Sequence, residues 1–160
     1  MALLRLAGRL DGASYLDLIS RAKKVYANGT RHIIIDLAQI AHLSSAGIVG
    51  IHQIAVLLRG ETPLDPETGW DAFHAMADDL ERGIQPQIKL LAPTAQVRQA
   101  LERVGLTALI EIVEDLDTTI AAFAPVLIPP SRAARPTPRY VRALNWAVRT
   151  PRPNPTPTPC

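Results

Sequence analysis

The architecture of this chain follows from the stretch Arg31-His-Ile-Ile-Ile-Asp-Leu-Ala-Gln-Ile-Ala-His-Leu-Ser-Ser-Ala-Gly-Ile-Val-Gly-Ile-His52. Its three isoleucines, residues 33–35, are β-branched and apolar on both faces of an extended chain. A short run of this kind predicts a buried strand in a sheet that is covered on both sides. After Asp36 we expect a short connection and then a helix, because apolar residues recur at helical spacing at Ile48, Ile51, Ala55 and Leu58.

Two adjacent serines, Ser44 and Ser45, stand at the predicted start of this helix. Either hydroxyl is placed to accept a hydrogen bond from a backbone N–H of the first turn and so to cap the helix. One interpretation is therefore an ordinary capped helix. The other is a regulatory helix start, where an added phosphate would bring nearly two negative charges to a surface that a partner must cover. The residues alone leave both interpretations open.

Four segments, taken in order, are similar to a known family. They are Leu6-Ala7-Gly8-Arg9-Leu10-Asp11, Ile33-Ile34-Ile35-Asp36-Leu37, Leu43-Ser44-Ser45-Ala46-Gly47-Ile48 and Leu101-Glu102-Arg103-Val104-Gly105-Leu106. On these segments, residues 3–123 resemble a STAS domain, the fold of the anti-sigma-factor antagonists of bacteria. The resemblance implies an α/β fold with a sheet of about four strands covered by helices. Strand and helix patterns also alternate along the chain, as expected for such a sheet.

The serine motif departs from the family pattern, which is usually Asp-Ser-Ser-Gly-Leu with the phosphate on the serine before the glycine. Aligned without gaps, Ala46 takes the place of that serine, Ser45 matches the serine before it, and Ser44 replaces the aspartate. The switch then has two versions: Ser45 accepts the phosphate instead, or the switch is lost and binding is constitutive. We favour the second. The resemblance implies a partner-binding face made of Asp11, Ser44, Ser45, Ala46, Gly47 and Ile48.

The family works by partner switching in the control of transcription. The unphosphorylated antagonist captures an anti-sigma factor of the serine-kinase type and frees a sigma factor, and phosphorylation by the same kinase blocks the capture. The resemblance therefore implies an anti-sigma factor, or a related serine kinase and phosphatase, as partners. The alternative is a scaffold or sensory STAS module without a phosphorylation switch, which acts by oligomerisation or by holding a small ligand.

The resemblance implies a STAS domain at residues 1–124, with an insertion at about 60–86, and an abrupt change of composition marks a tail at 125–160. In the insertion, Trp70, Phe73, Met76, Ala77 and Leu80 predict an amphipathic helix. We expect Trp70 and Phe73 to pack on the domain, and the alternative is an accessory docking or dimer contact. A further family strand would precede the one near Leu3, so either the sheet lacks an edge strand, which leaves backbone groups open to pairing, or the true start lies upstream.

The remaining elements of the domain have weaker signals. Ser14 with Asp17 resembles a capping box before a helix that ends at Asn28-Gly29. We expect further elements in this order: a first strand at 3–7, a strand at 87–92, a helix begun by Pro93-Thr94 and closed by Gly105, a strand at 109–113 and a helix at 116–123.

The tail has a different composition from the domain. All 15 acidic residues precede Pro125, whereas the tail carries arginines and alternating prolines. We expect it to be mostly disordered, with at most a marginal helical turn at residues 140–148. Its role is a solvated tether or, alternatively, electrostatic attachment to an acidic surface. Nucleic-acid binding is not expected beyond weak contacts of the tail, because Tyr140 and Trp146 alone do not make a stacking platform.

The chain offers no pattern for catalysis. His32, His42, His52 and His74 lack metal-ligand spacing, and Cys160 is the single cysteine. The glycine of a nucleophile elbow is missing before Ser45, and no glycine-rich phosphate loop is present. We therefore expect a binding protein without metal or cofactor, and not an enzyme. One cysteine and no apolar run long enough to cross a bilayer favour the reducing cytoplasm.

Overall fold

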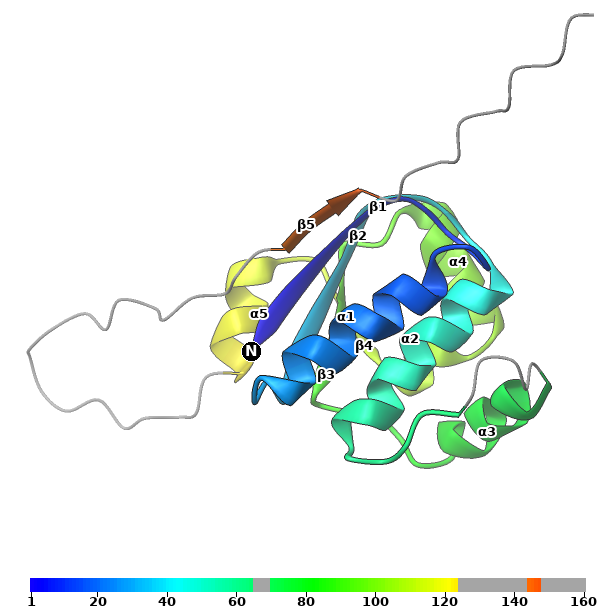
Figure 1. The fold of residues 1–160 in the computed structure, drawn as a ribbon. Coiled ribbons are helices and arrows are strands. Elements are labelled where there is room, and N and C mark those ends of the chain that lie inside the picture. The colour runs from blue at the N-terminus through cyan, green and yellow to red at the C-terminus, as the bar shows by residue number, and fades with distance from the viewer. Residues whose placement is uncertain (65–69, 124–143, 148–160) are drawn as a thin grey trace, which may run out of the picture.

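The computed structural model describes residues 1–64, 70–123 and 144–147. It is an α/β structure built on one five-stranded, all-parallel sheet with the strand order β4-β3-β2-β1-β5 (Figure 1). The strands are β1 (Ala2–Leu10), β2 (Ile33–Leu43), β3 (Ile88–Leu91), β4 (Glu111–Val113) and β5 (Leu144–Ala147). The predicted α/β architecture is confirmed.

The helices are α1 (Tyr15–Ala27), α2 (Ser45–Leu58), α3 (Trp70–Leu80), α4 (Ala95–Arg103) and α5 (Leu116–Phe123). The helix predicted in the insertion is confirmed as α3. The strand predicted at 109–113 is shorter, because the chain first makes a 3₁₀ turn at Leu106–Ala108. That turn begins at Gly105, whose φ of 77° lies in the left-handed region that glycine adopts without strain.

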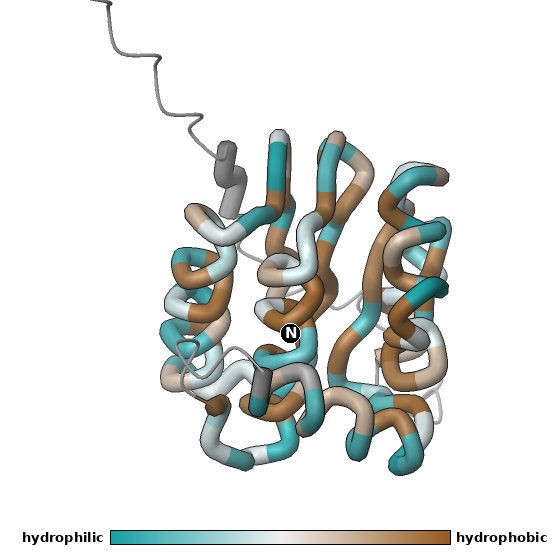
Figure 2. The backbone as a smooth tube through the Cα atoms, turned by 90° about the vertical axis from the view of Figure 1, so that its right-hand side faces the viewer, coloured by the Kyte–Doolittle hydropathy of each residue, from teal (hydrophilic) through white to brown (hydrophobic). Residues whose placement is uncertain are grey.

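The central strand β2 is buried on both faces, as its three isoleucines predict. Ile33, Ile34 and Ile35 are all 0% exposed. Ile33 and Ile35 belong to the main core beneath α1, α2 and α4, whereas Ile34 packs on the opposite face of the sheet under α5. The sheet therefore separates a large core from a small one. Figure 2 shows hydrophobic and hydrophilic residues alternating along each turn of the helices.

Strand β2 runs past the predicted connection after Asp36 and ends at Leu43. The expected loop is wrong because β1 pairs with β2 along its whole length, from Ala2 with Ile33 to Leu10 with Leu43. Two register shifts interrupt this pairing, and β3 follows β2 only as far as Asp36. The extended end of β2 leads directly into Ser44, so the serine motif begins at the end of the strand.

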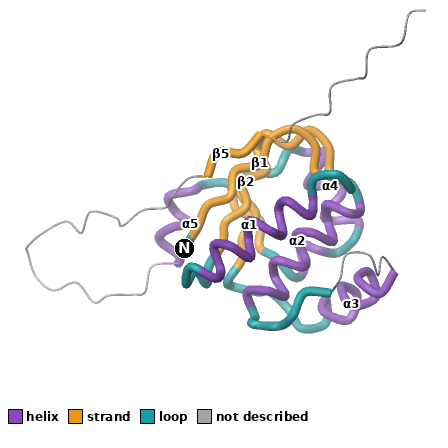
Figure 3. The backbone as a smooth tube through the Cα atoms, viewed as in Figure 1, coloured by secondary structure: helices purple, strands orange, loops and turns teal. Residues whose placement is uncertain are grey.

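The outer side of β1 is occupied by a strand from the tail. β5 pairs with β1 in parallel, from Leu4 with Leu144 to Ala7 with Ala147, and lies beside it in Figure 3. The predicted helical turn at 140–148 is therefore wrong over Leu144–Ala147. The sheet also has five strands and not about four, because β1 has backbone groups on its outer side to which the tail segment pairs. The expectation of disorder for the rest of the tail, 125–143 and 148–160, falls outside the described residues.

Candidate functional site

The edge of the sheet where the strands end brings two of the predicted site segments together. β1 and β2 are parallel neighbours that end at the paired residues Leu10 and Leu43, so Asp11 and Ser44 leave the sheet at the same edge. The Ser44 N–H donates to the Leu10 carbonyl oxygen at 2.9 Å and ties the two loops to each other. The helices α1 and α2 therefore begin side by side (Figure 1).

Ser44 is the residue that caps α2. Its backbone is extended, with φ −89° and ψ 169°, and its Oγ accepts from the Gly47 N–H at 3.3 Å. Its carbonyl oxygen accepts from the Ile48 N–H at 3.0 Å, which starts the helical ladder. Ser45, the first residue of α2, is exposed, and Ala46 is half-buried. Capping by Ser44 thus leaves the Ser45 side chain on the surface.

Gly47 and Ile48 belong to the interior and not to the predicted binding face. Ile48 is 4% exposed and lies in the main core. A Cβ on Gly47 would lie 2.5 Å from the Leu10 carbonyl oxygen and 2.8 Å from Leu43 Cδ1, so only glycine fits against the end of β1. Both residues position the start of α2, and their inclusion in the face is corrected. The accessible part consists of Asp11, Ser44, Ser45 and Ala46.

The loop that carries Asp11 is held by Ser14. The Ser14 Oγ accepts from the Asp11 N–H at 3.0 Å and donates to the Arg9 carbonyl oxygen at 3.1 Å. The predicted capping box of Ser14 with Asp17 is wrong, because this buried hydroxyl makes no side-chain cap to α1. Asp11 itself accepts from the Ala13 N–H at 3.1 Å and pairs with the Arg9 guanidinium at 3.5 Å. Asp11 is therefore fixed, half-buried, at the edge of the site.

A polar cluster that the sequence did not indicate joins α2 to the insertion. Asp79 Oδ2 contacts His52 Nε2 at 2.8 Å and Arg59 at 2.7 Å, and Asp79 Oδ1 contacts Arg82 at 3.2 Å. Glu61 completes the cluster through Arg59 and Arg82. We call these five residues the α2–α3 polar cluster. The sequence feature that could have revealed the cluster is Asp79, a carboxylate three residues after Met76 on the buried side of α3.

The charges of this cluster are set by burial and by pairing. Burial opposes ionisation of Asp79, but its bonds to Arg59 and His52 hold the pKa of Asp79 below its usual value. Burial lowers the pKa of His52, although Asp79 acts in the opposite direction. His52 is 1% exposed, and its Nδ1 has no hydrogen-bond partner among the described residues. The neutral ring with the proton on Nε2 therefore fits this site, because that tautomer donates to Asp79.

Stability should fall in mild acid because of His52. Its folded pKa lies below the unfolded value of about 6.5, so the unfolded chain binds the proton first and stability is lost as the pH drops below that value. We expect the free energy of unfolding to decrease more between pH 7.5 and pH 5.5 in the native protein than in His52→Gln, by at most about 1.4 kcal/mol per pH unit. Urea unfolding across this range measures the difference, in which the other histidines cancel. An equal pH dependence of the free energy of unfolding in the two proteins would contradict a neutral, buried His52.

The proposed accessory residues Trp70 and Phe73 lie on α3, but their side chains fall outside the described residues. Two neighbours on the same helix, Ala72 and Met76, are buried at 2% and 5% exposure, and Met76 belongs to the main core. The helix thus packs on the domain, while the docking role of Trp70 and Phe73 stays a prediction.

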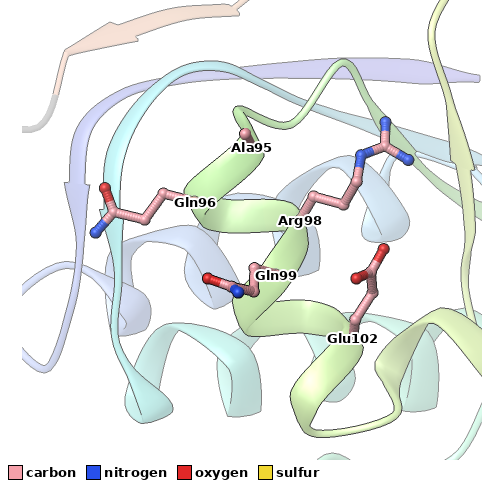
Figure 4. A pocket seen from close by; sticks show the side chains of 5 residues that line it. All are labelled: Ala95, Gln96, Arg98, Gln99 and Glu102. Carbon is pink, nitrogen blue, oxygen red and sulfur yellow. The ribbon is translucent and has the colours of Figure 1, made fainter.

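The described residues contain no site suited to catalysis by a metal. No group of three or more His, Cys, Asp or Glu side chains in residues 1–64, 70–123 and 144–147 is arranged to hold a metal ion. One shallow depression lies on the outer face of α4, where Arg98, Gln99 and Glu102 stand on a single helix (Figure 4). A second hollow lies between the sheet and α5 and is lined partly by Lys89 and Glu111, which pair with each other. Neither hollow is lined by Asp11 or by a residue of the serine motif.

The chain matches no protein-family model and no curated protein. Within the part of the chain that the structure describes, no helix combines the length and apolar character needed to cross a membrane.

Proposed function

We propose that this chain is a cytoplasmic, non-catalytic binding protein of the STAS anti-sigma-factor antagonist type. Its partner is an anti-sigma factor of the serine-kinase type, and the docking face consists of Asp11, Ser44, Ser45 and Ala46. The segments that resemble the family support the proposal. The observation that carries it is the exposed Ser45 at the start of α2, next to the loop of Asp11 at one edge of a parallel sheet. Loops at this edge are where open α/β sheets usually bind their ligands.

The side chains at this edge suit close docking. Ser45 and Ala46 are small, so a partner can approach the first turn of α2 closely. The hydroxyl of Ser44 is engaged with the Gly47 N–H, whereas Ser45 presents its side chain to solvent. The buried Gly47 holds this turn against Leu10, so the face is preorganised and loses little conformational freedom when it binds.

The departure at Ala46 separates two versions of the switch. Ser45 accepts the phosphate, or binding is constitutive, and we favour constitutive binding. Incubation of the purified protein with the cognate kinase, followed by mapping of the phosphate by mass spectrometry, distinguishes them. Phosphate on Ser45 that disappears in Ser45→Ala rules out the constitutive version.

A negative charge at Ser45 should weaken binding without harming the fold. We expect Ser45→Asp to lose at least tenfold in affinity for the anti-sigma factor, because a carboxylate buried in the interface without a cation is costly. The thermal midpoint should stay unchanged or rise slightly, since an acidic side chain in the first turn interacts favourably with the helix dipole. Isothermal titration calorimetry and a thermal melt on the same protein measure both effects.

The control for this variant adds the same charge at a distant helix. Gln99 is exposed on the outer face of α4, so Gln99→Glu should bind as the native protein does. Native affinity in Ser45→Asp would show that this face does not dock the partner. Equal losses in both variants would point instead to a general effect of charge.

The second candidate function is a scaffold module of the same family that acts by oligomerisation. The observation that favours it is the long strand β1, whose outer side pairs, within the described residues, with the four residues of β5. The oligomeric state of the purified protein tests this candidate, because a strict monomer without ligand contradicts it.

A further inference from the structure

Within the described residues, β5 covers part of the outer edge of β1. β1 has nine residues, whereas β5 has four and pairs only from Leu4 to Ala7. In the described sheet no other strand lies on this side, since the order ends with β1 and β5. In the described part of the sheet, Ala2 and Leu3 at one end of β1 and Gly8 to Leu10 at the other therefore lie beyond the segment paired with β5.

The outward-facing backbone groups of β1 follow from its bonds to β2. The Ala2 N–H donates to the His32 carbonyl oxygen, so the N–H of Ala2 points toward β2. Successive N–H groups along a strand point to opposite edges, which places the N–H groups of Leu3, Arg5 and Ala7 on the outer edge. The strand is also apolar, with Leu4 and Leu6 each 3% exposed. Arg5 and Ala7 lie in the segment that pairs with β5, so displacement of β5 would free their donors on an apolar edge that is a template for another strand.

The segment β5 has an advantage over a strand from another molecule, because it belongs to the same chain as β1. Residues 124–143 join α5 to β5, a tether of 20 residues. A covalent tether of this length gives β5 a local concentration on the order of millimolar at β1. The short pairing of four residues can therefore keep β5 on the edge of its own chain at micromolar protein concentrations. Once β5 has left the edge, a longer strand can pair with β1 in its place.

We propose that β5 caps the β1 edge of its own chain, and that a second copy of this chain pairs with the same edge, β1 against β1, when β5 is displaced. Tail engagement thereby controls dimerisation. The inference is independent of the proposed docking face, because β5 and the outer edge of β1 contribute none of its residues.

The charges of β1 select one arrangement for this pairing. Two copies of one strand related by a two-fold axis pair antiparallel, and the longest overlap centres on Leu6, the middle of β1. In that register Arg5 stands opposite Ala7, and Arg9 opposite Leu3. A shift of the axis to Arg5 would oppose two copies of Arg5, and a shift to Ala7 would oppose Arg5 to Arg9. Like charges directly opposite are destabilising, so the register centred on Leu6 is favoured.

The arginines are already neutralised within each chain, which lowers their mutual repulsion. Arg5 pairs with Asp36 at 3.6 Å, and Arg9 pairs with Asp11 at 3.5 Å. Two charged residues on an edge strand otherwise discourage pairing between copies. With their carboxylate partners on the same chain, they permit a dimer while disfavouring the registers that bring arginines face to face.

The test uses the full chain and removes the pairing of β5 by substitution. Asn145→Pro with Trp146→Pro eliminates two adjacent strand donors, so one of them is lost from the ladder whichever edge each faces. We expect sedimentation equilibrium to give a monomer for the native protein and a doubled mass for the double variant at tens of micromolar. A synthetic peptide of residues 142–149, added at millimolar concentration, should return the double variant to a monomer.

Two matched pairs of variants make the result specific. Arg5→Pro removes an outward N–H of β1 and should abolish the dimer of the double variant, whereas Arg5→Ala keeps that N–H and should leave the dimer intact. Asn154→Pro with Thr156→Pro adds prolines to the tail outside β5 and should leave the chain monomeric. Circular dichroism on each variant verifies the fold.

A folded double variant that stays monomeric overturns the proposal. So does a dimer that survives Arg5→Pro, since it must use another surface. A dimeric native protein that becomes monomeric in the double variant would show that β5 joins two copies itself, which contradicts capping within one chain. If proline at 145 and 146 unfolds the domain, the peptide still decides: added to native protein, it should not change the mass, and a mass change contradicts the competition.

Discussion

Gly47→Ala will destabilise the fold by up to about 2 kcal/mol, the balance of a clash that costs about 1–3 kcal/mol and a gain in helix propensity of about 1 kcal/mol. The added Cβ would lie 2.5 Å from the backbone oxygen of Leu10 and 2.9 Å from its Cγ. Overpacking of this kind costs about 1–3 kcal/mol, and a backbone oxygen that also accepts from Ser44 cannot move aside cheaply. Alanine is favoured over glycine in a helix interior by about 1 kcal/mol, which offsets part of the loss. Urea unfolding at pH 7.5 measures the difference.

Two other glycines serve as matched controls for this variant. A Cβ on Gly12, in the same loop as Asp11, meets nothing within 4 Å, so Gly12→Ala should be neutral or slightly stabilising. A Cβ on Gly50, in the next turn of α2, would approach the Tyr15 Cβ to 3.2 Å, which predicts a smaller loss than at Gly47. We expect the loss of stability to be largest in Gly47→Ala, smaller in Gly50→Ala and absent in Gly12→Ala. Equal stabilities for the three variants would mean that α2 does not press on the end of β1.

Gly47→Ala should also weaken partner binding beyond its effect on stability. A displaced start of α2 breaks the hydrogen bond from Ser44 to Leu10 and separates Ser45 from the Asp11 loop. Binding measured well below the unfolding midpoint therefore distinguishes a distorted face from an unfolded protein.

Asp79→Asn will destabilise the domain by about 3 kcal/mol and release the insertion from α2. The side chain of Asp79 is 8% exposed and accepts from His52, Arg59 and Arg82. An amide keeps the shape but removes the charge, and breaking a buried ion pair from one side costs about 3–5 kcal/mol because the other charge stays buried. Arg59 retains its exposed partner Glu61, which places the expected loss at the lower end. Urea unfolding at pH 7.5 gives the magnitude.

The neighbouring carboxylate provides the control. Asp78 precedes Asp79 on α3 and is exposed, so Asp78→Asn should change the free energy of unfolding by less than about 0.5 kcal/mol. Hydrogen exchange should show faster amide exchange across α3 in Asp79→Asn than in Asp78→Asn. Similar losses in the two variants would contradict a specific role for the α2–α3 polar cluster.

Local patterns in the sequence predicted the elements that local physics determines. The burial of β2 on both faces of the sheet follows from the uninterrupted run of isoleucines at 33–35, and α3 follows from the helical spacing of its apolar residues. Ser44 was one of two predicted caps, and its bond to the Gly47 N–H selects it over Ser45. The position of Asp11 beside Ser44 was expected from the resemblance and agrees with the order of parallel strands.

The features that were missed depend on pairing between distant segments. The length of β2 is set by its pairing with β1, and no pattern within residues 36–43 announced it. The strand at Leu144–Ala147 forms because β1 has an open edge, and its sequence alone favoured a turn. The burial of Ile48 and the contact of Gly47 with Leu10 depend on how closely α2 approaches the sheet. The contact between Asp79 and His52 on α2 joins residues that are 27 positions apart in the sequence.

The small second core has a consequence for the order in which the chain folds during synthesis. Ile34 and Leu3 are made early, but the helix that packs against them, α5, is the last helix of the described chain and ends at Phe123. Until that helix has emerged from the ribosome, the apolar residues on this face of the nascent sheet remain exposed to solvent, even after α1 and α2 have covered the other face. Chaperone dependence should therefore be concentrated in the last stage of translation, after Val113 and before Phe123 becomes available.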